Sequence, residues 1–240
     1  MGINKYYIVK AQSKIESLDK LQVVGITGSL GKTSTKLIST AILKHKYRVL
    51  NIPENHNTFL DISRTINEKL NNKHQILIVE MDTKNIGDIR KLSTLVKPNI
   101  GVITTIEQTN LVTFKNIDNV MKAKYEIVEA LPADGLAVFN YDNEYVKKLA
   151  DKTFKEKILY GMNDINKLDI YAENIEVTEE GMDFTIKDKD GHSIKCSTKV
   201  TDKYDIYNIL AGVSIAYALG LNFNEIKKGI SKLESIFVET

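Results

Sequence analysis

Residues 23–35 combine glycines, a lysine and hydroxyl side chains in a spacing that can bind phosphate. The segment reads Val-Val-Gly-Ile-Thr-Gly-Ser-Leu-Gly-Lys-Thr-Ser-Thr, so an apolar run leads into a glycine-rich turn and then into a helical pattern. Glycines let backbone N–H groups point toward an anion, and the helix N-terminus adds partial positive charge. Lys32 can reach terminal phosphates, and the Thr33 hydroxyl can bind magnesium. We therefore predict a phosphate-binding loop made of Gly28, Ser29, Leu30, Gly31, Lys32, Thr33 and Ser34.

One position of this segment departs from the general P-loop pattern. That pattern begins with a glycine where this chain has Ile26. The alternative interpretation is a tight turn followed by a capped helix, with no ligand. The strand pattern before the turn and the helix pattern after it favour the phosphate-binding interpretation.

A carboxylate ends another apolar run. Glu80 follows Ile76–Val79, a run that reads as a strand buried on both faces. Ligands of parallel sheets lie outside the carboxyl ends of the strands, so Glu80 would share an edge with the glycine-rich loop. Carboxylate oxygens suit magnesium. The alternative is a solvated strand end.

The elements that would position these residues alternate along the first 150 residues. β-branched runs at 21–27, 47–51, 75–80, 100–105 and 136–140 read as strands, and helical patterns cover 32–46, 60–70, 88–96 and 117–131. This alternation is typical of an α/β fold of the P-loop type, with a mostly parallel sheet flanked by helices.

The pattern changes in the last third of the chain. Alternating apolar and polar residues from about 168 to 200, with turns at Glu180-Gly181 and Asp190-Gly191, predict a small antiparallel β appendage. Two helices follow, at 204–219 and 224–233. Residues 1–20 read as a lead-in helix, and residues 21–240 as one domain that contains the β insert.

Composition excludes several classes of protein. The 240 residues are 42% hydrophobic, with a net charge of +2 and a single cysteine. The apolar content excludes a disordered chain, and the balanced charge argues against nucleic acid as the main partner. No apolar run is long enough for a membrane span or a secretion signal. We expect a cytoplasmic protein, since Cys196 has no partner within the chain.

Several motifs in a fixed order resemble the central ATP-binding domain of the Mur ligases. They are Thr27–Ser34, Asn55–Thr58 (Asn-His-Asn-Thr), Glu80-Met81, Lys97–Asn99, Ala123–Glu126 (Ala-Lys-Tyr-Glu) and Tyr207–Ala211. The resemblance covers residues 21–233 and is greatest for the subgroup that adds D-alanyl-D-alanine to a UDP-muramoyl tripeptide. It implies transfer of the γ-phosphoryl group of ATP to a carboxylate, followed by attack of an amine on the acyl phosphate, in peptidoglycan precursor synthesis.

The resemblance also implies roles for individual residues. Lys32 would contact the phosphates, while Thr33 and Glu80 would hold a first magnesium ion. Lys124 matches the family's carbamylated lysine, which binds a second magnesium ion, so Lys32 and Lys124 are the catalytic candidates. The alternative for Lys124 is a solvated cation on an amphipathic helix.

Four more residues have expected roles by the same resemblance. Asn208 would contact the adenine, with Asp205 three residues away on the same helical face, although the pair could also be an exposed or capping pair at a helix start. Asn57 and Thr58 would lie near a UDP-muramoyl-peptide-like substrate.

The chain departs from the family pattern at several positions. Asn110 stands where the family has a histidine ligand of the second magnesium ion; an amide oxygen can still bind magnesium. Tyr204-Asp205 replaces His-Asn, and Asp82 replaces a glycine. The family's N-terminal UDP-substrate domain and its C-terminal domain have no counterpart in these 240 residues.

These departures leave three alternatives to a ligase domain. They are a nucleotide-binding module without catalysis, a small-molecule kinase, and a structural or partner-binding body with a vestigial loop. We expect the domain by itself to bind ATP or hydrolyse it slowly, because closure of the flanking domains completes the site. The sequence does not indicate an oligomeric state.

Overall fold

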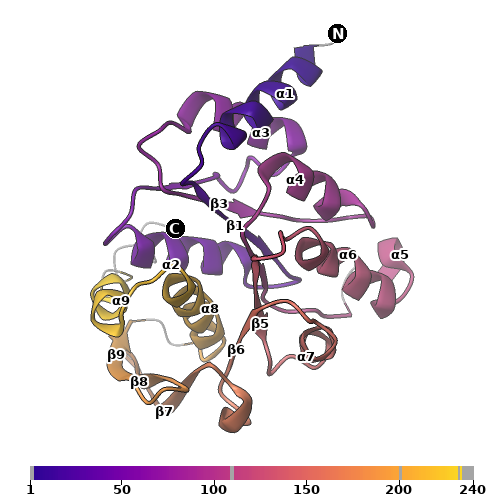
Figure 1. Ribbon diagram of the computed structural model, residues 1–240. Coiled ribbons are helices and arrows are strands. Elements are labelled where there is room, and N and C mark those ends of the chain that lie inside the picture. The colour runs from indigo at the N-terminus through magenta and orange to yellow at the C-terminus, as the bar shows by residue number, and fades with distance from the viewer. Residues whose placement is uncertain (1–2, 109–110, 200–201, 232, 234–240) are drawn as a thin grey trace.

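A computed structural model describes residues 3–108, 111–199, 202–231 and 233. Its centre is a nine-stranded sheet in the order β2-β3-β1-β4-β5-β6-β7-β8-β9 (Figure 1). The first six strands run parallel: β1 (Gln22–Thr27), β2 (Val49–Asn51), β3 (Ile76–Glu80), β4 (Ile100–Ile103), β5 (Leu136–Asn140) and β6 (Lys157–Gly161). The last strands are β7 (Ile170–Thr178), β8 (Gly181–Asp188) and β9 (Ser193–Thr198); β7 pairs parallel to β6, and β8 pairs antiparallel to both β7 and β9.

Helices cover both faces of the sheet. One face carries α1 (Ile3–Glu16), α3 (Phe59–Lys69), α4 (Asp88–Val96), α5 (Leu111–Phe114), α6 (Ile117–Glu129) and α7 (Glu144–Asp151). The other face carries α2 (Lys32–Leu43), α8 (Tyr204–Ala218) and α9 (Phe223–Ile230), and a short 3-10 helix, η1 (Ile165–Lys167), precedes β7. Figure 1 shows α2, α8 and α9 gathered on one side of the sheet.

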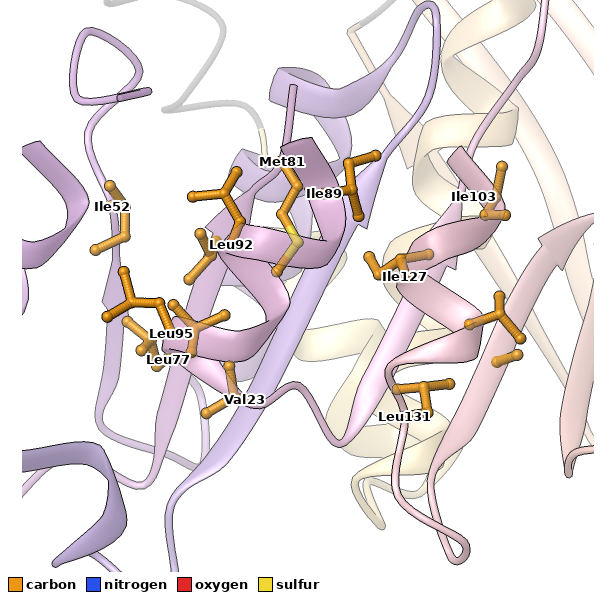
Figure 2. Packing of buried hydrophobic residues seen from close by; sticks show 14 of the residues in the cluster. Val23, Ile52, Leu77, Met81, Ile89, Leu92, Leu95, Ile103, Ile127 and Leu131 are labelled. Carbon is orange, nitrogen blue, oxygen red and sulfur yellow. The ribbon is translucent and has the colours of Figure 1, made fainter. Parts of the chain in front are cut away.

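The two faces have separate hydrophobic cores. Figure 2 shows side chains of one core, in which Val23, Leu77 and Ile103 of the sheet meet Leu92 of α4 and Ile127 of α6. The other core joins the opposite side of the same strands to α2, α8 and α9. Burial of strands on both faces explains why they read as continuous apolar runs.

The predicted α/β class is confirmed, with corrections in detail. The antiparallel strands do not form a sheet of their own, since β7 pairs with β6 and continues the main sheet. The chain forms α7 and β6 between residues 141 and 167, where no helix or strand was predicted. The strand predicted to reach residue 105 ends at Ile103, and the helix predicted to reach residue 46 ends at Leu43.

The predicted lead-in helix is part of the packed body. Ala11 and Ile15 of α1 are buried in the core beside α3 and α4. The Lys14 ammonium donates to the carbonyl of Asn67, and the Asn67 amide donates to the carbonyl of Tyr7, both at 2.8 Å. The division into residues 1–20 and residues 21–240 stays a prediction. In the structure α1 packs against α3 and forms hydrogen bonds with it.

Strand order places the predicted site residues at one edge. β1 lies between β3 and β4, so the chain leaves β1 toward one side for β2 and β3 and later returns to the other side as β4. Such a switch point opens a crevice at the carboxyl ends of the strands. The loop after β1, Glu80 at the end of β3 and the segment after β4 meet there.

Candidate functional site

The loop between β1 and α2 depends on two close contacts at glycines. Gly31 has a φ of 78° and is the N-cap of α2. A Cβ at Gly31 would overlap Oδ1 of Asn208, and one at Gly28 would overlap Oγ1 of Thr104. Only glycine fits at these two positions without movement of the neighbouring side chains.

The backbone N–H groups of the loop divide into two sets. Ser29 N–H donates to the Thr105 carbonyl at 2.8 Å, and Leu30 N–H donates to Oγ1 of Thr105 at 3.0 Å. The N–H groups of Gly31, Lys32, Thr33 and Ser34 donate to no acceptor in the described part of the chain. The available amide donors are therefore fewer than the loop sequence suggests and lie at the first turn of α2, where the helix dipole favours an anion.

The segment after β4 holds the loop in this shape. The Thr104 hydroxyl donates to the Leu30 carbonyl at 2.6 Å, and Glu107 N–H donates to the Ser29 hydroxyl at 3.1 Å. The loop is thus preorganised by the protein. Ser29, Leu30 and Ser34 stay predicted phosphate contacts.

Thr33 and Glu80 lie together as predicted. The Thr33 hydroxyl donates to both oxygens of Glu80, at 3.2 Å to Oε1 and 3.0 Å to Oε2. A hydroxyl and a carboxylate beside free amide donors fit magnesium bound to a phosphate, because magnesium takes few protein ligands and shares phosphate oxygens. Nearby, the Lys32 ammonium lies 3.8 Å from the carboxylate of Asp82 and donates to the Ser29 carbonyl at 3.3 Å.

Lys124 reaches the loop from α6. Its side chain is 4% exposed, and its ammonium donates to the Gly28 carbonyl at 2.7 Å. Burial lowers the pKa of Lys124 to about 8, with a further lowering from Lys32 and an opposing effect from Asp82. The alternative of a solvated cation is therefore wrong, and Lys124 lies at the phosphate loop.

Two hollows meet at Asp82. One, of about 190 Å³, is lined by Gly28, Ser29, Lys32, Asp82, Thr83, Phe114, Val120 and Lys124. The other, of about 480 Å³, includes Asn57, Thr58, Asp82, Lys84, Asp88 and Lys91 in its lining. The predicted substrate residues thus lie beside the phosphate site. A third hollow, of about 560 Å³, lies at the ends of α4 and α6, and none of the predicted site residues lines it.

Asn208 and Asp205 approach the loop from α8. Asn208 is 4% exposed; its amide donates to Asp205 at 3.0 Å, and its Oδ1 accepts from the Thr35 hydroxyl at 3.4 Å and touches Gly31. Burial raises the pKa of Asp205. Asn208 therefore packs against the loop at Gly31. Its contact with adenine stays a prediction.

Three polar residues near the site were missed by the sequence analysis or left without a role. Lys36 lies 3.2 Å from Glu80, and Asp82 lies between the two hollows. Glu126, fully buried, accepts from Gly87 N–H at 2.7 Å and Arg90 N–H at 3.0 Å, and so caps α4. Helical spacing gave a signal for Lys36, which lies one turn after Thr33 on the same face.

The structure gives no placement for one predicted metal ligand. Asn110, the predicted ligand of a second magnesium ion, lies outside the described residues. Among the described residues, no three His, Cys, Asp or Glu side chains form a metal cluster, and no helix is both long and apolar enough to cross a bilayer.

Comparisons with known proteins match most of this chain. The profile of the Mur ligase middle domain matches residues 26–216. The UDP-N-acetylmuramoyl-tripeptide--D-alanyl-D-alanine ligase of Buchnera aphidicola (subspecies Baizongia pistaciae) is 31% identical over 93% of this chain and 48% of its own length; that of Escherichia coli K12 is 27% identical over 90% and 47%. This chain thus spans about half the length of the curated relatives it matches.

Solved structures share the fold. MurF from Acinetobacter baumannii has a TM-score of 0.87 at 24% identity, over 95% of this chain and 49% of that one. A MurF ligase from Thermotoga maritima in complex with ADP has a TM-score of 0.83 at 23% identity, over 93% and 52%.

Proposed function

Because this chain belongs to the Mur ligase family through the middle domain of those enzymes, we propose that it binds ATP and magnesium as the nucleotide-binding part of a MurF-type ligase. Such a ligase forms an amide bond in peptidoglycan precursor synthesis. The observation that supports this most directly is the pairing of Thr33 with Glu80 beside the free N–H groups of Gly31, Lys32 and Thr33.

The residues present suit a bound triphosphate. The free amides of residues 31–34 and the Lys32 ammonium would bind phosphate oxygens, and Thr33 and Glu80 would hold magnesium. Bound ATP would supply the phosphoryl group that activates a carboxylate as an acyl phosphate. Phosphoryl transfer needs mainly positioning and charge neutralisation, which this loop, its lysines and the metal provide.

Lys124 has the properties that carbamylation requires. With its pKa lowered to about 8, a larger share of its side chain is the neutral amine near pH 7.5 than for a solvated lysine. The neutral amine can add carbon dioxide, forming a carbamate and releasing a proton. The carbamate would be an anionic oxygen ligand for a second magnesium ion, which we propose that Asn110 also binds.

The hollow of about 480 Å³ is the proposed place of a UDP-muramoyl-peptide-like substrate. Asn57 and Thr58 line it from the start of α3. Lys84 and Lys91 balance the charge of Asp82 and Asp88 in the same lining, and they are the groups that would bind anionic parts of the substrate. The hollow shares Asp82 with the phosphate site, so a carboxylate bound there would lie near the γ-phosphoryl group.

We propose that ligation requires this domain together with segments equivalent to the half of the relatives that this chain does not match. Water exclusion in phosphoryl-transfer sites comes from closure of further elements. We place the protein in the cytoplasm, because the buried Cys196 is a free thiol.

The proposal is tested by ATP binding and by ATP-dependent phosphate release with magnesium. We expect Lys32→Ala and Lys124→Ala to reduce phosphate release by at least ~100-fold, since Lys32→Ala removes a positive charge beside the phosphates and Lys124→Ala removes the proposed carbamate ligand of the second magnesium ion. Lys44→Ala, an exposed lysine at the end of α2, is the matched control and should behave as wild type. Binding of ATP without any turnover would favour the non-catalytic module, and absence of ATP binding at millimolar magnesium would refute the proposal.

A further inference from the structure

Lys36 is a buried cation directly beside the carboxylate proposed to hold magnesium. It lies on α2 one turn after Lys32, and its side chain is 2% exposed. Its ammonium nitrogen lies 3.2 Å from Oε2 of Glu80, which is 16% exposed. A lysine is almost never this buried without a partner, because desolvation of the charge is costly.

The pairing of Lys36 is ionic and incomplete. Within the described chain its nitrogen makes no hydrogen bond, and Glu80 is its ion-pair partner. The same Oε2 already accepts from the Thr33 hydroxyl at 3.0 Å. The carboxylate that the metal would need is therefore neutralised by the protein's own cation.

The surrounding charges point the same way. The ammonium groups of Lys32, Lys36 and Lys124 face the carboxylates of Glu80 and Asp82 around the loop. A free divalent cation entering this place meets two carboxylates, Glu80 and Asp82, that already lie beside the ammonium groups of Lys36 and Lys32. A triphosphate brings the negative charge that is missing, and its oxygens become metal ligands.

Building on the proposed function, we propose that Lys36 makes metal binding depend on the nucleotide. By pairing with Glu80 it weakens the binding of free magnesium, so the ion enters with ATP and not before it. Loss of Lys36 would also free the Glu80 side chain to rotate. Such rotation would weaken metal binding, because the carboxylate must be ordered again when the ion binds. Removal of the repulsion between the Lys36 ammonium and the divalent ion would strengthen metal binding, and this effect is larger in a partly buried site. The net expectation is tighter binding of free metal without Lys36.

The test is a titration of the full chain with Mn²⁺, followed by electron paramagnetic resonance, with and without the non-hydrolysable analogue AMP-PNP. Lys36→Met keeps an unbranched side chain, one atom shorter, and removes the charge. Lys36→Gln is a second neutral variant in case the methionine variant does not fold, and Lys36→Arg retains the charge. Lys44→Met is the control, since Lys44, the C-cap of the same helix, is exposed.

We expect the neutral variants to bind Mn²⁺ alone at least ~10-fold more tightly than wild type, equivalent to about 1.4 kcal/mol. With the nucleotide present, the difference from wild type should shrink, because the coupling between metal and nucleotide is reduced. Lys36→Arg and Lys44→Met should bind Mn²⁺ alone as weakly as wild type. A merely structural lysine would not change the affinity for free metal in this direction.

Two negative results are distinguishable. If wild type binds Mn²⁺ with AMP-PNP but the folded neutral variants bind free Mn²⁺ no more tightly than wild type, the role of Lys36 is refuted and the proposed function stands. If wild type binds no Mn²⁺ even with AMP-PNP, the proposed function itself fails. Circular dichroism identifies which neutral variant is folded, and either one decides the question.

Discussion

Gly31 is the residue at which the phosphate loop turns into α2. Its φ of 78° and its contact with Asn208 both exclude a Cβ. We expect Gly31→Ala to lower the free energy of unfolding by about 2–4 kcal/mol, the sum of a left-handed backbone and a steric overlap. It should also weaken ATP binding, because the free amides at 31–33 would move. Urea denaturation and nucleotide titration measure the two effects.

Gly87 is the matched control for this substitution. Its φ is 98°, and a Cβ there would meet nothing within 4 Å. Gly87→Ala should lower the free energy of unfolding only through the strain of the left-handed backbone, by about 1–2 kcal/mol. The double variant Gly31→Ala with Asn208→Ala should recover part of the extra loss. If Gly31→Ala and Gly87→Ala lower the free energy of unfolding equally, the contact with Asn208 adds nothing to the cost and the prediction is contradicted.

The site residues recognised from the sequence are those whose type and spacing carry a local signal. Lys32 and Thr33 follow a glycine turn, and Glu80 ends an apolar run, so each could be placed before the structure was known. Asp82 and Lys36 could not be given a role in the same way. The significance of Asp82 comes from the meeting of two hollows, and that of Lys36 from a carboxylate on a strand distant in sequence.

Helix α4 ends in a conformation that its sequence does not favour. Lys97, the C-cap, has a φ of 49°, a left-handed backbone that glycine adopts without strain. We expect Lys97→Gly to raise the free energy of unfolding by about 0.5–1 kcal/mol, since relief of strain exceeds the loss of its exposed ion pair with Glu16. Chemical denaturation measures the gain.

The control for this prediction lies within the same helix. Lys91 is exposed in the middle of α4, where the backbone is right-handed. Lys91→Gly should lower the free energy of unfolding by about 1 kcal/mol, because glycine is unfavourable inside a helix. Destabilisation by both substitutions would mean that Lys97 stabilises the fold through its side chain.

Elements were predictable from sequence where burial imposes a strong pattern. β3 lies between β2 and β1, and its run Ile-Leu-Ile-Val is buried and apolar throughout, whereas β6 alternates with partly exposed positions at Lys157 and Leu159. α7 is eight residues long with only three buried positions, too short for a clear helical period. The register that joins β7 to β6 depends on two residue pairs, which no local pattern specifies.

The whole molecule is sensitive to pH through a thiol in the sheet. Burial raises the pKa of Cys196 in β9 to about 12, from 9.0 for an exposed thiol. Between these values the unfolded chain loses the thiol proton and the folded chain keeps it. The free energy of unfolding of the wild type should therefore fall, relative to Cys196→Ala, as pH rises above 9, by at most about 1.4 kcal/mol per unit.

Urea denaturation of both proteins at pH 8 and pH 10 measures this difference. Below pH 9 the two should differ by a constant amount, the cost of removing the sulfur atom from the core. Parallel pH dependences from pH 8 to pH 10 would contradict the prediction, and would indicate that the edge strand β9 opens before the rest of the molecule unfolds.

Helix α6 fixes two neighbours of the site at once. Lys124 is held by the Gly28 carbonyl, and Glu126, two residues later on the opposite side, is held by the first turn of α4. A rigid spacer therefore separates the glycine turn from the base of α4. Any movement of α6 would therefore displace the glycine turn and the first turn of α4 together, and with them the hollow that Asp88 and Asn57 line.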